Sequence, residues 1–233
     1  MKFVRTACAP LAAALVLAAG QAAGSPPPTA PPSRGLAAAG VSDARIDLRQ
    51  AVQVVHDMKS DPRVARLLRD ANGVLVLPDY GRAALGLGIQ AGEGVLVTRH
   101  GRTYSDPAFF DLAGISLGLQ AGVSGGPVAL LLMTDRAVQQ FRSNRRLSLD
   151  AAAGLTIAAY SARHQVSQGR LQDVIVWSGT DGLYAGAALG VTDIVADAEA
   201  NRAYYGRHVT PNEILGGLVD NPHPNVLGLV LAI

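Results

Sequence analysis

Cysteine, long apolar runs and surplus charge are all scarce in this chain of 233 residues, and each scarcity excludes a class of protein. The only cysteine is Cys8, so no disulfide can staple the rest of the chain, which must be held together by its core. The apolar run Ala7–Ala19 is shorter than the about 20 residues that a transmembrane helix needs. The 26 glycines follow no Gly-X-Y period, which excludes collagen. With 49% hydrophobic and 16% charged residues, the sequence also excludes a disordered chain.

The first 24 residues predict a secretory signal peptide. Lys2 and Arg5 precede the apolar run, and small residues follow it through Gly24. Residues 25–35 are rich in proline and predict an extended linker. We therefore expect an exported protein with a single folded domain over residues 36–233.

The basic pI of about 8.9 comes largely from the predicted signal peptide. Without residues 1–24 the chain holds 18 basic and 18 acidic residues, so a nucleic-acid partner loses its main support. The charges are unevenly spread: residues 36–170 hold 15 basic and 11 acidic residues, and residues 171–233 hold 2 and 7. The sequence predicts a dipolar domain that does not bind nucleic acid.

Apolar residues recur at helical spacing from Ser42 to Lys59, which predicts an amphipathic helix. Asp61-Pro62 is a typical helix start, so a second, shorter helix should complete a hairpin. The same reasoning predicts short helical segments after three further starts and one apolar strand at the end of the chain. The segments are Ser105–Phe110, Thr134–Phe141 and Thr210–Leu215, and the strand is Val226–Ile233.

Glycine falls on alternate positions in three stretches: Leu85–Gly94, Gly114–Ser124 and Gly182–Val191. Because strand side chains alternate between faces, each stretch would have one aliphatic and one nearly bare face. A bare face lets a strand bend sharply or lets another backbone pack closely, and we expect the aliphatic face to lie against the core. The predicted fold is α+β: a Gly-rich, strongly curved antiparallel sheet or partly closed barrel, with an N-terminal helical hairpin and short flanking helices.

Two motifs resemble catalytic or cofactor sites. Gly114–Gly118 matches the G-x-S-x-G nucleophile elbow, with Ser116 as nucleophile and Asp193 and His208 or His223 as partners. However, Leu117–Gly122 repeats Leu87–Gly92 at an offset of 30 residues, and at the same offset Ser116 takes the place of Gly86. The repeat therefore needs a small residue at this position, and not a hydroxyl group. Gly86–Ala91 matches a dinucleotide fingerprint but leads into a strand, whereas that site needs a helix.

The five histidines are scattered, without the spacing of metal ligands. We expect no catalytic residue, no cofactor and no metal.

Basic residues gather in two places. Lys59, Arg63, Arg66 and Arg69 flank the helical hairpin, and a second group follows the helix that ends at Phe141; its members are Arg142, Arg145 and Arg146. Either group could bind anionic lipid headgroups, at about 1 kcal/mol for each residue near the surface. The alternative is a solvated helix face whose arginines pair with nearby aspartates: Asp57, Asp61 and Asp70.

Several ordered motifs between Val41 and Leu218 together resemble the SYLF domain. They are Ala71–Pro78, Gln90–Leu96, Ser105–Pro107 before Phe109, Leu112–Gly122, Met133–Asp135, Asp173–Gly182 and Tyr204–Gly206. The resemblance implies binding of phosphoinositides or other anionic lipids through an N-terminal amphipathic helix and nearby basic residues, and it implies no enzyme. It favours Lys59, Arg63, Arg66 and Arg69 as the lipid-binding residues.

The resulting hypothesis is a non-catalytic protein of the bacterial cell envelope, periplasmic or envelope-associated, that binds anionic phospholipid headgroups peripherally. Two alternatives stay open. One is a structural or protein-interaction module of the envelope, and the other is a serine hydrolase that uses Ser116.

Overall fold

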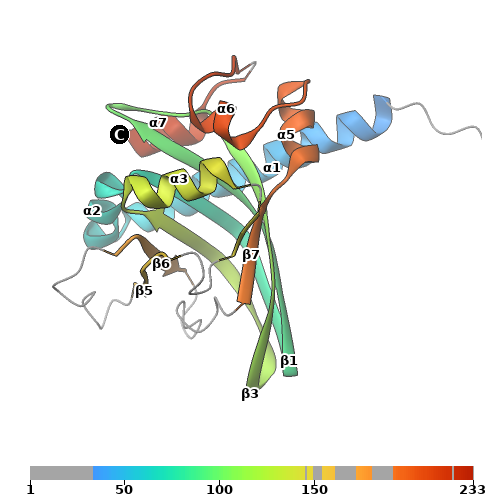
Figure 1. The fold of residues 1–233 in the computed structure, drawn as a ribbon, viewed down its shortest axis with the longest axis vertical. Helices are drawn as coiled ribbons and strands as arrows, with labels where there is room; N and C mark the ends of the chain where they lie inside the picture. The colour runs from blue at the N-terminus through green and yellow to red at the C-terminus, as the bar shows by residue number, and fades with distance from the viewer. Residues whose placement is uncertain are drawn as a thin grey trace, which may run out of the picture. The chain divides into compact units, whose positions relative to one another are not determined.

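The computed structural model describes residues 34–144, 146–148, 154–160, 172–179, 191–221 and 223–232. In this part of the chain, seven strands form one strongly curled, open sheet, a half-barrel with helices around it (Figure 1). The helices are α1 (Arg34–Lys59), α2 (Pro62–Asp70), α3 (Asp135–Ser143), α5 (Ala198–Tyr205), α6 (Pro211–Leu215) and α7 (Val226–Ala232). The strands are β1 (Gly73–His100), β2 (Thr103–Tyr104), β3 (Ala108–Leu132), β4 (Arg146–Ser148), β5 (Ile157–Ala159), β6 (Val174–Ser178) and β7 (Val191–Ala196). The predicted α+β class with a curved sheet is confirmed.

The predicted helical hairpin is present as α1 and α2. Helix α1 begins at Arg34, before the predicted Ser42, and ends at Lys59 as expected. Asp61 caps α2, since its Oδ1 accepts a hydrogen bond from the backbone N–H of Arg63 at 2.8 Å, and Pro62 takes the first helical position. The start signals of α3 and α6, at Thr134 and Thr210, are confirmed in the same way.

Strands β1 and β3 form a long antiparallel ribbon that doubles back on itself. Twenty-eight residues of straight strand would span about 90 Å, yet the two ends of β1 lie face to face. A Cβ added at Gly94 would lie 3.0 Å from Leu75 Cδ1, and one at Gly92 would lie 3.3 Å from Leu77 Cδ2. Register shifts at Leu77/Tyr80 and Leu85/Leu87 mark bulges that help the ribbon bend.

The bare glycine face therefore points inward at Gly92 and Gly94, where it lets the two arms of β1 approach closely. This confirms the predicted close backbone packing. The predicted placement of the aliphatic face is wrong here, because Ile89 is 65% exposed and Ala91 is exposed, while Gln90 is buried. At Gly92 and Gly94 the space between the arms is already filled by the side chains of Leu75 and Leu77, so the face that carries Ile89 and Ala91 is the one that points away. Residues 182–190 of the third stretch lie outside the described residues.

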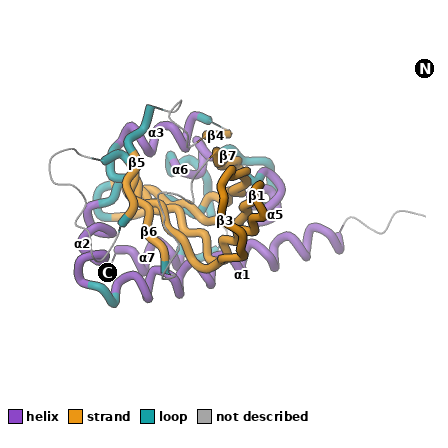
Figure 2. The backbone as a smooth tube through the Cα atoms, turned by 90° about the horizontal axis from the view of Figure 1, so that it is seen from below, coloured by secondary structure: helices purple, strands orange, loops and turns teal. Residues whose placement is uncertain are grey.

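The remaining strands extend the ribbon on either side. The order β2-β1-β3-β6-β5 makes the main sheet, and β7 pairs with β3 and β4. All pairs are antiparallel except β5 and β6, which are parallel. Figure 2 shows α1 running along one side of the sheet, with α3 and α6 on the other side. Helix α1 contacts α5, β1, α7 and α2, so it is the element that joins the N- and C-terminal parts of the domain.

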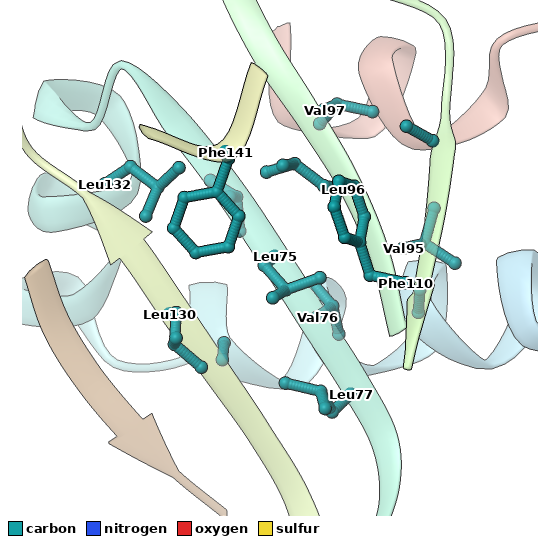
Figure 3. Packing of buried hydrophobic residues seen from close by; sticks show 14 of the residues in the cluster. Leu75, Val76, Leu77, Val95, Leu96, Val97, Phe110, Leu130, Leu132 and Phe141 are labelled. Atoms are coloured by element: carbon teal, nitrogen blue, oxygen red, sulfur yellow. The ribbon is translucent and has the colours of Figure 1, made fainter. Parts of the chain in front are cut away.

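The core lies between the sheet and its helices and is mostly aliphatic, with several buried aromatic rings. Figure 3 shows Phe141 of α3 pointing toward Leu75 and Leu132 of the sheet. The rings of Phe141 and Phe110 meet edge to face, with their centroids 6.1 Å apart. This packing fixes α3 on the sheet without any disulfide.

Two sequence predictions of local structure are wrong. Residues 108–110, expected to belong to a short helical segment, are instead the start of β3, where they pair with Gly94–Leu96 of β1. The backbone N–H and C=O of Phe109 also bond to the buried Asn201 side chain. Val226–Ala232, expected as a strand, is helix α7. Asn225 precedes that helix and caps it: its Oδ1 accepts from the backbone N–H of Gly228 at 2.9 Å.

Candidate functional site

The four basic residues singled out from the sequence lie at one end of the domain, where α1 ends and α2 follows. Arg63, Arg66 and Arg69 share one side of α2 and are all exposed. Arg66 and Arg69 form no ion pair within the part of the chain that the structure describes. Pairing with Asp57, Asp61 or Asp70, the alternative weighed from the sequence, is therefore not seen for these two arginines.

Lys59 is partly buried and is held in place by the C-terminal helix. Its ammonium group donates a hydrogen bond to the backbone carbonyl of Val230 in α7. Burial, and then the neighbouring charge of Arg69, lowers the pKa of Lys59. Lys59 and Arg69 are therefore close enough for their charges to repel each other.

A fifth basic residue, Arg99 at the end of β1, joins this group and was missed from the sequence. Its guanidinium donates to the carbonyl of Arg69 at the C-terminal end of α2, and to Asn72 Oδ1 at 3.5 Å. A cation at the carbonyl end of a helix is favourable. We call Lys59, Arg63, Arg66, Arg69 and Arg99 the basic edge.

The second basic group is committed to contacts within the domain. Arg146 forms an ion pair with Asp193, and its Nε donates to the same carboxylate at 2.9 Å. Arg142 donates to Asn212 Oδ1 at 3.1 Å. Arg145 lies outside the described residues. Lys59 and Arg99 of the basic edge make similar contacts, so the two groups differ in the exposed Arg66 and Arg69, which form no ion pair among the described residues.

A cavity of about 770 Å³ lies between α1 and the β1–β3 ribbon. Its floor is largely apolar, and four carboxylates line it: Asp47, Asp79, Glu93 and Asp111. Gly81, Gly92 and Gly125 also line it, together with Ile89 and Ala91. The buried Tyr80 and Gln90 beside it are joined by a hydrogen bond of 2.7 Å that links the two arms of β1.

The carboxylates of this acidic cavity repel one another. Burial, and then Glu93 followed by Asp43, Asp79 and Asp197, raises the pKa of Asp47 to about 6. Burial, and then Asp197 and Glu93, raises the pKa of Asp111 to about 6. The negative charge of this cavity disfavours binding of an anionic headgroup.

The nucleophile-elbow hypothesis lacks its geometry. Ser116 lies inside β3, where its backbone pairs with Gly88, and the strand continues to Leu132. The elbow requires a strand-to-helix turn at the serine, and the described backbone has none at this position. Asp193 pairs with Arg146, and the ring of His223 stacks edge-on against Tyr204. Gly86–Ala91 likewise lies within β1, with no helix after it.

The described residues contain no group of three or more His, Cys, Asp or Glu side chains placed to hold a metal ion. No helix among them has both the length and the hydropathy of a membrane span.

Comparison with known proteins identifies relatives of this chain. Residues 113–233 match the model of the Ysc84 family, described as Las17-binding protein actin regulator. Over 161 residues the chain is 30% identical to Protein YSC84 of Saccharomyces cerevisiae. This match covers 67% of this chain and 34% of the yeast protein. The chain is 29% identical over 161 residues to LAS seventeen-binding protein 3 of the same yeast, covering 67% of this chain and 35% of that protein.

A human relative is SH3 domain-containing YSC84-like protein 1, which is 26% identical over 166 residues. That match covers 69% of this chain and 47% of the human protein. The chain thus spans between a third and a half of the length of these relatives. No solved structure matches it. The family match covers more than half of the chain and agrees with the motifs that resemble the SYLF domain, so this chain belongs to the Ysc84 (SYLF) family.

Proposed function

We propose that this protein binds anionic membrane surfaces peripherally, through the basic edge, and that it does so without catalysis. The observation that carries the proposal is the convergence of five cationic side chains from α1, α2 and β1, of which Arg66 and Arg69 have no acidic partner among the described residues. At about 1 kcal/mol for each basic residue near an anionic surface, Arg66 and Arg69 together would change binding by roughly thirtyfold.

The proposal also includes a place in the cell. Residues 1–24 have the layout of a secretory leader, which supports export and a role at the bacterial envelope. Anionic headgroups at a membrane surface would be the ligand there, and a small cofactor has no part in the proposed function.

A co-sedimentation assay tests the headgroup site. The full chain is mixed with phosphatidylcholine vesicles that contain about a third phosphatidylserine, and the bound fraction is measured against lipid concentration. Arg66→Glu/Arg69→Glu should lower binding by at least the thirtyfold worked out above. The control variant is Arg202→Glu/Arg207→Glu, which makes the same change in net charge at two exposed residues. One lies in α5 and the other just after it, and Figures 1 and 2 show α5 at the opposite end of the domain from α2. This variant should retain binding.

Equal losses in the two double variants would show that net charge, and not the basic edge, governs binding. A phosphoinositide in place of phosphatidylserine, at equal total charge, distinguishes a specific headgroup from general surface charge. Raising the salt concentration should weaken binding in either case, because exposed charges are screened.

A second candidate function, a protein-interaction module, is favoured by the names of the relatives. The yeast and human relatives are named for Las17 binding and for an SH3 domain. We infer that a protein partner is the alternative if the full chain fails to sediment with vesicles of any composition.

A further inference from the structure

The apolar face of α1 is not available to a membrane, because the core of the domain already covers it. The buried residues of that face are Ala44, Leu48, Ala51, Val55 and Met58. Arg45, Arg49 and Gln53 on the other faces of α1 are exposed and polar. The basic edge can therefore supply charge to a membrane contact, but the end of α1 that carries Lys59 has no exposed apolar side chain to supply the hydrophobic part. Ile46, which is 42% exposed, lies 13 residues before Lys59 in the same helix.

Helix α7 has the opposite character: it carries no charged or polar side chain, and apolar residues lie on all of its faces. Leu227 and Leu231 are buried against the domain. Val226 and Leu229, three residues apart on the outer face, are 42% and 61% exposed. Helices that are apolar on all faces are normally buried in a protein core or in lipid. The outer face of α7 is instead exposed to solvent, which is unusual for a helix of this composition.

The outer face of α7 adjoins the basic edge. The carbonyl of Val230, next to Leu229, accepts the hydrogen bond from Lys59. Helix α7 also contacts α1 and β2, the short strand that pairs with the end of β1 that carries Arg99. Figures 1 and 2 both place the C-terminal end of α7 beside α2. Exposed apolar side chains thus stand next to cations, which is the pattern of a surface that lies in the headgroup region of an anionic bilayer.

We propose that Val226 and Leu229 of α7 insert into an anionic bilayer while the basic edge holds the headgroups. This inference rests on the proposed function and adds the part of the molecule that enters the lipid. The contact would be shallow, because the other face of α7 stays packed on the domain through Leu227 and Leu231. Removing the apolar contact of Leu229 should lower vesicle binding about tenfold.

Two pairs of matched variants test the insertion in the full chain. Leu229→Gln should reduce co-sedimentation with the phosphatidylserine vesicles about tenfold. Ile89→Gln removes an apolar side chain of nearly equal exposure, 65% against 61%, from the acidic cavity and should leave binding unchanged. All variants carry the same residues 1–33, so any contribution of that segment to binding cancels in the comparison.

Tryptophan reporters at the same positions show directly which residue enters lipid. The emission of Leu229→Trp should shift to shorter wavelength with vesicles and be quenched by brominated acyl chains, after subtraction of the signal from Trp177. The emission of Ile89→Trp should do neither. If the parent chain sediments but Leu229→Trp shows no shift, insertion of α7 is wrong and headgroup binding stands. If the parent chain does not sediment, the proposed function and this inference both fail.

Discussion

Replacing Asp47 by asparagine should stabilise the folded domain at neutral pH, and the gain should vanish in acid. Burial, and then the charge of Glu93, raises the pKa of Asp47 from 3.8 to about 6 on folding. Because the folded state holds this proton more tightly, stability falls as the pH rises from the unfolded value to the folded one and is then constant. The change in pKa on folding corresponds to a loss of roughly 3 kcal/mol in the free energy of unfolding at neutral pH. Because the Asp47 side chain is partly exposed, solvent screening reduces this loss to roughly 1 kcal/mol.

Urea unfolding of the parent chain and Asp47→Asn, at a pH of about 7.5 and again at about 4, measures this effect. We expect the variant to be more stable by roughly 1 kcal/mol at the higher pH and equal to the parent at the lower one, where Asp47 is already neutral. Asp220→Asn alters an exposed carboxylate outside the acidic cavity and should change neither value. A gain of the same size at both pH values would refute the electrostatic explanation, as would no gain at neutral pH.

Two further predictions concern the ribbon and α7. Gly94→Ala should lower the free energy of unfolding by roughly 1–3 kcal/mol, because the added methyl would lie 3.0 Å from Leu75 Cδ1. Gly81→Ala, which meets nothing within 4 Å, is the control, and equal thermal shifts in both variants would contradict the face-to-face packing of β1. Asn225→Ala removes the acceptor of the Gly228 N–H and should lower the free energy of unfolding by roughly 1–2 kcal/mol. Amide exchange within α7 should accelerate in that variant, and unchanged exchange would show that the cap is unimportant.

The wrong prediction for α7 shows where periodicity stops being informative. A short apolar run without polar positions has no face, so its pattern fits a buried strand and a helix equally well. The deciding signal was local: Asn225 directly before the run is a strong N-cap, and Pro224 precedes it. Correcting this element matters for function, because a strand would have paired with the sheet, whereas the helix leaves Leu229 exposed.

The glycine pattern predicted the curvature of the sheet but not which side of the ribbon faces inward. Alternation of Gly92 and Gly94 with Ala91 and Glu93 defines two faces without ranking them. Which face points inward is decided by the way β1 doubles back on itself, because this brings Leu75 and its neighbours against the glycine face. That contact joins residues about twenty positions apart in one strand, a distance that local patterns do not register.

The same distinction separates the predicted and the missed parts of the candidate site. The three arginines of α2 follow from an N-cap and a helical repeat, so the sequence was enough to put them on one face. Arg99 reaches α2 only because β1 ends there, and Val230 meets Lys59 across 171 residues of sequence. The acidic cavity likewise collects carboxylates from α1, β1 and β3 that no local spacing relates.

Charge separation along α1 links the basic edge to the acidic cavity. Asp47 and Lys59 are twelve residues apart in one helix, which puts about 18 Å between the acidic and the basic end. An anionic membrane would attract the basic edge and repel the cavity, and both forces act on the same rigid helix, so they turn the domain in the same direction. The cavity would then face away from the lipid while the outer face of α7 turns toward it. A lipid carrier needs the opposite orientation, with the mouth of its cavity at the membrane. The distribution of charge therefore favours a protein that binds at the membrane surface over one that extracts lipid from it.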